Sequence, residues 1–135
     1  MVHLARRRGE GSVLIARIAE AEHIPPNLLS SILHELKLRG FLSSKKGKGG
    51  GYLLAKNPAT ISLGEIVRTL DGHVFPMPCV SRSAYRPCDD CADDNACSVR
   101  AIMQDVRDAV AEILNLPLSE LAARTPGLAA LTYDI

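Results

Sequence analysis

The chain has 135 residues, 47% of them hydrophobic, which is enough for one buried core, and its net charge is +1. The core is expected to be aliphatic, because the chain has two Phe, three Tyr and no Trp. There is no apolar run of about eighteen residues and no stretch typical of a secretory signal at the start. We therefore expect a cytoplasmic protein without a membrane partner, in a compartment where permanent disulfides are disfavoured.

The modest net charge hides an uneven distribution. Residues 1–60 carry ten Lys and Arg against four Asp and Glu, whereas residues 61–135 carry six against eleven. A basic half suits a polyanion such as nucleic acid, although ordinary solvated surface charge is the alternative. The nucleic-acid interpretation is favoured because the basic residues coincide with the motifs that follow.

The first two expected elements are short helices. Residues 13–21 place apolar side chains on one helical face, and the pair Pro25-Pro26 then opens a second helix, where proline fits the first turn. Gly40 is expected to end that helix. Two short helices with a tight connection predict a helix-turn-helix. The apolar residues of the second helix are Leu28, Leu29, Ile32, Leu33 and Leu36.

A β-hairpin is expected next. Residues 41–44 and 52–55 are short apolar runs on either side of a glycine-rich turn. Lys45, Lys46 and Lys48 at its tip are typical of the wing of a winged helix, and they are candidate phosphate or minor-groove contacts. A phosphate-cradling nucleotide loop is not expected, because the pattern G-x4-G-K-S/T is absent.

Two further helices are predicted after the hairpin. Ser62 and Glu65 form a capping box that opens a short helix ending at Asp71-Gly72. A segment over residues 73–97 follows, in which prolines oppose regular structure. A long helix is then expected over residues 98–116.

The long helix carries one apolar stripe. Little of so small a protein remains to cover the stripe, so a dimer seam is favoured over an intramolecular face. Beyond Pro117, residues 118–122 predict one more helical turn. The stripe consists of Val99, Ile102, Val106, Ala109, Val110, Ile113 and Leu114.

All four cysteines fall within nineteen residues, as Cys79, Cys88, Cys91 and Cys97, with the spacing C-x8-C-x2-C-x5-C. Cysteine concentrated in one loop is typical of a soft metal centre or of a thiol–disulfide switch. Four thiolates suit tetrahedral zinc, and Cys88-x2-Cys91 has the spacing of a zinc knuckle. The same pair could instead form a metal-free switch. His73 is a reserve ligand, the alternative being an ordinary surface histidine.

Together these motifs resemble the Rrf2 type of winged-helix regulators, which includes regulators of iron–sulfur cluster supply, nitric-oxide sensing and cysteine metabolism. The resemblance covers about residues 10–121. It implies a mainly α fold with a small β-wing and a long dimerisation helix, acting as a homodimer on double-stranded promoter DNA. The motifs that carry it are Ile18-Ala19-Glu20, Ile24-Pro25, the helix over residues 28–36, residues 40–44, residues 49–55, Ile61-Ser62-Leu63 and Leu70-Asp71-Gly72.

The resemblance also implies DNA-contacting positions. By position, Asn27, Leu28 and Ser30 would face base edges and Lys46 would enter the minor groove, in keeping with a recognition helix whose first turn reads the bases. The operator sequence does not transfer, because Leu28 stands where an aromatic is common and Ser30 where some members have Glu. The first helix of the family is usually longer, and Met1 begins in the middle of it, so either the start is misassigned or this is a variant with a truncated N-terminal helix.

Cluster-binding members of the family ligate iron through three cysteines in this loop, ending in C-x5-C before the long helix. Cys91 and Cys97 match that pair, and either Cys79 or Cys88 would be the third ligand. Arg100 stands where relatives have a histidine ligand and cannot replace it, so all four cysteines would complete the set. The expected cofactor is an iron–sulfur cluster, 2Fe–2S in preference to 4Fe–4S, with zinc as the alternative.

The sequence thus predicts a transcriptional repressor whose promoter affinity depends on a cluster. It divides into a DNA-binding region (1–60) and a region with the capping helix, the cysteine loop and the dimerisation helix (61–135). Enzymatic activity is not expected, because there is no Ser/His/Asp grouping, H-E-x-x-H motif or nucleotide loop. The alternative is a zinc-binding or thiol-switch winged-helix protein that acts through protein interaction or the redox state of its cysteines.

Overall fold

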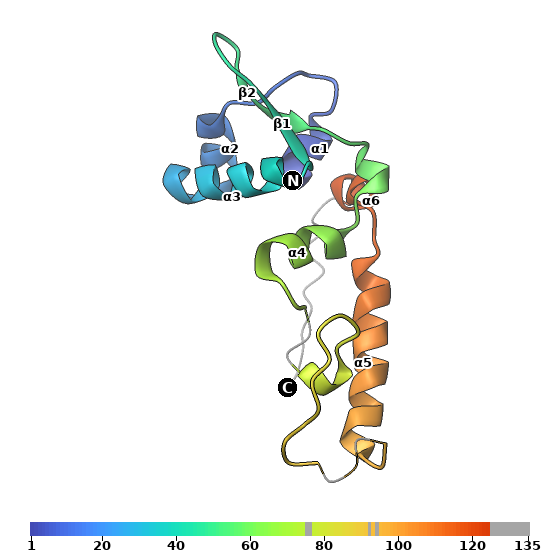
Figure 1. Cartoon of the computed structure of the whole chain (residues 1–135). Coiled ribbons are helices and arrows are strands. Elements are labelled where there is room, and N and C mark those ends of the chain that lie inside the picture. The colour runs from blue at the N-terminus through green and yellow to red at the C-terminus, as the bar shows by residue number, and fades with distance from the viewer. Residues whose placement is uncertain (75–76, 92, 94, 125–135) are drawn as a thin grey trace.

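The computed structural model describes residues 1–74, 77–91, 93 and 95–124, so the end of the second predicted region lies outside the described residues. The fold is mostly helical with one two-stranded antiparallel sheet, which confirms the predicted fold class. Figure 1 shows a winged-helix region at one end, from which a single long helix runs away alongside the cysteine segment. Within the described ranges, every helix is too short or too polar to cross a bilayer.

The helix-turn-helix consists of α2 (Ile15–Glu22) and α3 (Pro26–Leu38). The first of these begins two residues later than expected, because Val13 forms an isolated antiparallel bridge with Tyr52 instead of a helical turn. Two backbone hydrogen bonds, each 2.8 Å long, join Val13 and Tyr52. Helix α2 ends at His23, whose φ of 53° lies in the left-handed region. Helix α3 buries Leu29, Leu33 and Leu36.

The predicted hairpin is formed by β1 (Leu42–Lys45) and β2 (Gly51–Leu54), which pair in antiparallel register. Gly51 has a φ of 142°, and a Cβ atom at this position would lie 2.2 Å from the carbonyl oxygen of Val13. Glycine is therefore required for the hairpin to approach the strand-like segment before α2. The bridge fixes the hairpin against the helix-turn-helix.

The two ends of the described chain meet in the core. Helix α6 (Leu118–Ala123) packs against α1 (Val2–Arg6) and against the 3-10 turn η1 (Pro58–Thr60). Leu118 is fully buried, and its N–H donates to the carbonyl of Ile61 over 2.8 Å. After the long helix, the chain thus returns to the winged-helix region, where α6 completes the hydrophobic core.

The capping box is present at the start of α4 (Leu63–Asp71). The N–H of Glu65 donates to Ser62 Oγ over 3.1 Å, and the N–H of Ser62 donates to Glu65 Oε2 over 2.8 Å. This backbone hydrogen bond is the main cause that lowers the pKa of Glu65. The long helix α5 (Ser98–Leu114) begins where the sequence predicts, after the 3-10 turn η2 (Pro78–Val80) and an irregular segment.

Leu118→Ala is expected to lower the free energy of unfolding by about 2–5 kcal/mol, because a fully buried leucine leaves a cavity between α6 and α1. Leu38→Ala is the matched control, since Leu38 is 69% exposed and its loss should change stability by less than about 0.5 kcal/mol. Urea unfolding followed by circular dichroism measures both. Equal stabilities of the two variants would show that α6 is not part of the core.

Candidate functional site

The three predicted base-facing residues lie at the start of α3. Asn27, Leu28 and Ser30 are all exposed, with Leu28 55% accessible, while Leu29 points into the core. Pro26 occupies the first helical position, where its fixed φ suits the helix and its missing N–H costs no hydrogen bond. The structure therefore puts all three residues on one accessible end of the helix.

The three wing lysines project from the tip of the hairpin. Lys45, Lys46 and Lys48 are exposed, and within the described part of the chain no carboxylate forms a salt bridge with them. The turn between them needs φ values of 91° at Gly47 and 83° at Gly49, which glycine adopts without strain. Their charge is thus available to a polyanion.

Part of the basic charge in the first sixty residues is used internally. Arg6 donates to the carbonyls of Ala122 and Arg124 over 3.0 Å each, and Arg8 donates to Asn57 Oδ1 over 2.8 Å. The guanidinium groups of these two arginines are occupied by contacts within the fold, although both keep their positive charge because the acceptors are neutral. In contrast, Arg17 is exposed in the first turn of α2, and no sequence motif indicated it.

A shallow groove lies between the wing and the start of α2. Leu14, Ala16, Lys45 and Tyr52 are among the residues that line it. Leu14 is 50% exposed there. The wing and the first helix of the motif flank this groove, so Lys45 of the wing lies beside the start of α2. No single motif indicated it, since it depends on the bridge between segments far apart in the chain.

Three of the four cysteine sulfurs converge at the N-terminus of α5. Hydrogen bonds of Cys91 with Cys88 and with Cys97 raise the pKa of the Cys91 thiol to about 12, with burial adding to the effect. Cys97 is the N-cap of α5, and its Sγ accepts from the N–H of Arg100 over 3.4 Å. All three thiols are half-buried, and no disulfide joins them.

Cys79 occupies a different setting. It is only 7% exposed, within η2, and its carbonyl accepts from Arg100 Nε over 3.0 Å. The next carbonyl, that of Val80, accepts from Arg107 Nη1 over 2.7 Å. Two arginines of α5 therefore hold the backbone of η2 beside the helix. The sequence indicated neither contact, since Arg100 was noted only as standing where relatives have a histidine ligand.

The donor set fits a thiolate-bound centre by its chemistry. Soft sulfur ligands are those that iron–sulfur clusters and zinc require. Cys88, Cys91 and Cys97 are in contact, but they do not adopt the geometry of a metal site. Among the residues that the structure describes, no three His, Cys, Asp or Glu side chains are arranged to hold an ion. The reserve ligand His73 is exposed and lines a separate pocket between α4 and α5.

The apolar stripe of α5 divides between two faces. Val110 and Leu114 are half-buried on the side of α4, so the structure separates them from the rest of the predicted stripe. No residue of α5 is fully buried. The remaining members alternate at spacings of three and four, which is the spacing of a coiled-coil seam. We call this set the exposed strip of α5: Val99, Ile102, Val106, Ala109 and Ile113.

A helix-turn-helix with an accessible recognition helix, a basic wing and a long appended helix defines a winged-helix transcriptional regulator. Residues 1–124 match the Rrf2 family, described as an iron-dependent transcriptional regulator. The chain belongs to this family. It is thus a transcriptional regulator of the same kind as its relatives.

Named relatives agree with this assignment. An rrf2-like HTH-type transcriptional regulator of Rhodobacter capsulatus is 43% identical over 102 residues, which cover 76% of this chain and 68% of the relative. IscR of Pectobacterium atrosepticum is 30% identical over 122 residues, 90% of this chain and 71% of the relative. The solved structure of CymR, the global cysteine regulator of Bacillus subtilis, is 29% identical with a TM-score of 0.76, covering 92% of this chain and 88% of that one.

Proposed function

We propose that the protein is a repressor that binds promoter DNA as a homodimer and whose affinity depends on an iron–sulfur cluster at its cysteine loop. The observation that carries the DNA-binding part is the exposure of Asn27, Leu28 and Ser30 at the start of α3, together with the exposure of the three wing lysines. A recognition helix in the major groove and a basic wing beside it would contact bases and phosphates, respectively.

Replacing Lys45, Lys46 and Lys48 together with alanine should weaken the salt dependence of DNA binding. Removing one phosphate contact lowers the slope of log K against log salt by about 0.9, so three contacts per subunit correspond to about 5 per dimer. Fluorescence anisotropy over a series of salt concentrations measures the slope. Arg86→Ala is the control, because Arg86 is exposed and belongs to the cysteine segment, which Figure 1 shows at the opposite end of the molecule from the wing. A slope unchanged in the triple variant would contradict the proposed interface.

The exposed strip of α5 supports the homodimer. Ile102 and Ile113 are 59% and 68% exposed in the single chain, and together with their neighbours they form a continuous apolar surface. Burial of such a surface stabilises association by about 25 cal/mol per Å² of apolar area removed from water. Two copies of α5 packed along the strip would cover it, while leaving the wings and recognition helices free to contact DNA.

The convergence of Cys88, Cys91 and Cys97 supports the cluster, with Cys79 as the fourth ligand. A bound cluster supplies a group that responds to oxygen, nitric oxide or iron supply. The chain's own part is to place Cys97 at the first turn of α5, so that the ligand set is joined directly to the helix that carries the proposed seam. Anaerobic purification followed by an absorption spectrum and by iron and sulfide assays tests this part. We keep 2Fe–2S as the proposed form.

A metal-free thiol switch is the second candidate. The contact of Cys91 with both Cys88 and Cys97 favours it, because a disulfide could form there with little movement. The same hydrogen bonds oppose fast oxidation, since a thiol with a pKa of about 12 is protonated at neutral pH and the thiolate is the reactive form. Mass spectrometry of the protein after exposure to peroxide, with and without reduction, detects the disulfide that this candidate requires.

A further inference from the structure

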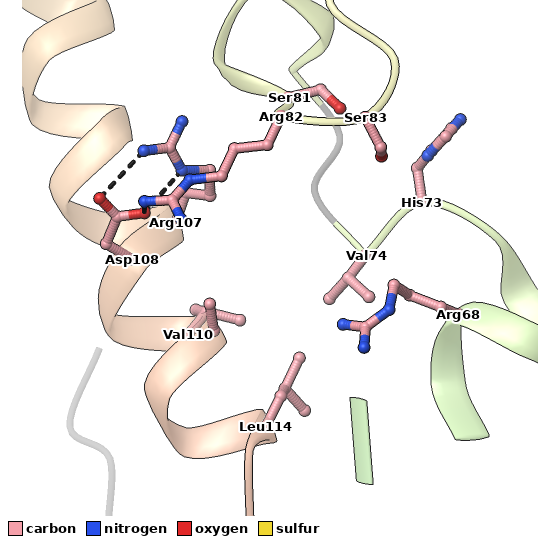
Figure 2. A pocket seen from close by; sticks show the side chains of 11 residues that line it. Arg68, His73, Val74, Ser81, Arg82, Ser83, Arg107, Asp108, Val110 and Leu114 are labelled. Atoms are coloured by element: carbon pink, nitrogen blue, oxygen red, sulfur yellow. Dashed lines mark hydrogen bonds and ion pairs between the residues drawn. The ribbon is translucent and has the colours of Figure 1, made fainter. Parts of the chain in front are cut away.

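A pocket of about 170 Å³ lies between α4, the segment after η2 and α5, apart from both the wing and the cysteine thiols. Figure 2 shows its lining: Arg68 from α4 and Val74 on one side, and Val110 and Leu114 from α5 on the other. The remaining wall is formed by residues 81–83. The pocket thus combines an apolar base with polar side chains at its edge.

The charge around this pocket is unbalanced. Three guanidinium groups, those of Arg68, Arg82 and Arg107, face a single carboxylate, Asp108. Arg82 and Arg107 both bind that carboxylate, over 2.9 and 2.8 Å. Arg107 also donates to the Val80 carbonyl, so it is held in place. The local charge is therefore positive even after this ion-pair network has formed.

The guanidinium group of Arg68 takes no part in this ion-pair network. Among the residues that the structure describes, no salt bridge joins Arg68 to a carboxylate, and Glu65, one turn earlier on α4, interacts with it only through space. Its Nη1 atom would lie 3.0 Å from a Cβ atom at position 64, so Gly64 leaves the space that the side chain needs to extend over α4. Figure 2 shows the guanidinium directed toward Val74 and Leu114, into the pocket.

We propose that this pocket binds a small organic carboxylate, with its acid group on Arg68 and its apolar part on Val74, Val110 and Leu114. A planar guanidinium pairs with a carboxylate through two parallel hydrogen bonds. An engineered cavity of about 150 Å³ accommodates benzene, so a pocket of this size takes a ligand of roughly six to ten non-hydrogen atoms. A nucleotide would be too large, and an inorganic anion would leave the apolar base uncovered.

The position of the pocket joins it to the cysteine segment. Ser81 and its neighbours form the wall and directly follow Cys79 and Val80, whose carbonyls are held by α5. A bound acid would therefore contact the segment that carries Cys79. Binding itself requires neither DNA nor a cluster, so its test is independent of the proposed function.

Benzoate and benzamide are suitable probes because they share one shape and differ in charge. The full-length protein, labelled with ¹⁵N, is titrated with each compound at constant ionic strength, and amide shifts are followed by NMR. A ligand of this size is expected to bind with a Kd on the order of 1 mM. Benzoate should shift amides of residues 68, 74 and 110–114, and benzamide should bind at least about tenfold more weakly.

Two variants locate the carboxylate. Arg68→Gln should weaken benzoate at least about tenfold while leaving benzamide unchanged, because only the charged hydrogen bonds are removed. Arg39→Gln is the matched control: Arg39 is an exposed arginine of an i,i+4 pair in the helix-turn-helix region, and its replacement should not change benzoate affinity. Equal affinities for benzoate and benzamide, an equal loss in both variants, or no shift with 20 mM benzoate would each overturn the proposal.

Discussion

Ile102→Asp is expected to convert a dimer into a monomer. Ile102 belongs to the exposed strip of α5, where two-fold pairing would bury two introduced carboxylates without partners. A buried unpaired charge costs several kcal/mol, so the dimer should weaken by at least about 4 kcal/mol, or roughly a thousandfold in dissociation constant. Sedimentation velocity at micromolar concentration measures the loss, and an unchanged circular dichroism spectrum shows that α5 still folds.

Ala101→Asp is the control for this substitution. Ala101 neighbours Ile102 but lies on the polar side of the helix with Asp105 and Asp108, where a further carboxylate stays solvated. This variant should remain dimeric. Val106→Asp, one turn further along the strip, should dissociate as Ile102→Asp does. A wild-type protein that is already monomeric at micromolar concentration would refute the seam.

Cys91→Ser is expected to abolish the cluster. Cys91 contacts both Cys88 and Cys97, and serine replaces its sulfur with a hard oxygen donor of similar size that binds iron poorly in such sites. Anaerobically isolated wild-type protein should be coloured and contain iron and acid-labile sulfide, and the variant should lose both. The DNA affinity of the variant should match that of wild-type protein from which the cluster has been removed.

Further substitutions distinguish the cluster ligands from nearby residues that do not bind the cluster. Cys97→Ser should give the same loss, whereas comparison of Cys79→Ser with Cys88→Ser shows whether both ligate or one is spare. His73→Ala should retain the cluster, because His73 lines the pocket between α4 and α5. Colourless wild-type protein with one tightly held zinc per chain, after anaerobic expression with ample iron, would replace the cluster with the zinc alternative.

The elements that the sequence predicts well are those with local signals. The capping box at Ser62 and Glu65, the glycines of the wing and the start of α5 at Ser98 each depend on residues a few positions apart. The bridge from Val13 to Tyr52 and the burial of Leu118 depend on segments far apart in the chain. Apolar periodicity shows that a face will be covered, but it does not show which distant segment covers it.

The candidate site shows the same limit. The family resemblance, and not the periodicity, predicted Asn27, Leu28 and Ser30 as base-facing residues: apolar spacing groups Leu28 with the core-facing leucines of α3, whereas the structure exposes it. The sequence pattern grouped Val110 and Leu114 with the exposed strip of α5, because a broad apolar stripe does not show that its two sides face different neighbours. The pairing of Arg100 and Arg107 with backbone carbonyls of η2 leaves no pattern in the sequence, because any residue can supply a carbonyl.

Helix α5 is anchored at both ends, by the Cys97 cap at its start and by the buried Leu118 just after its end. Its seventeen residues make a rod about 25 Å long. When one end of such a rod tilts by about 10°, the other end moves by about 4 Å, because a helix transmits tilt without bending much. Recognition helices of a dimer must match grooves about 34 Å apart. In the proposed dimer, a rearrangement of ligands around Cys97 would therefore change the distance between the two recognition helices, while the winged-helix region of each subunit kept its own structure.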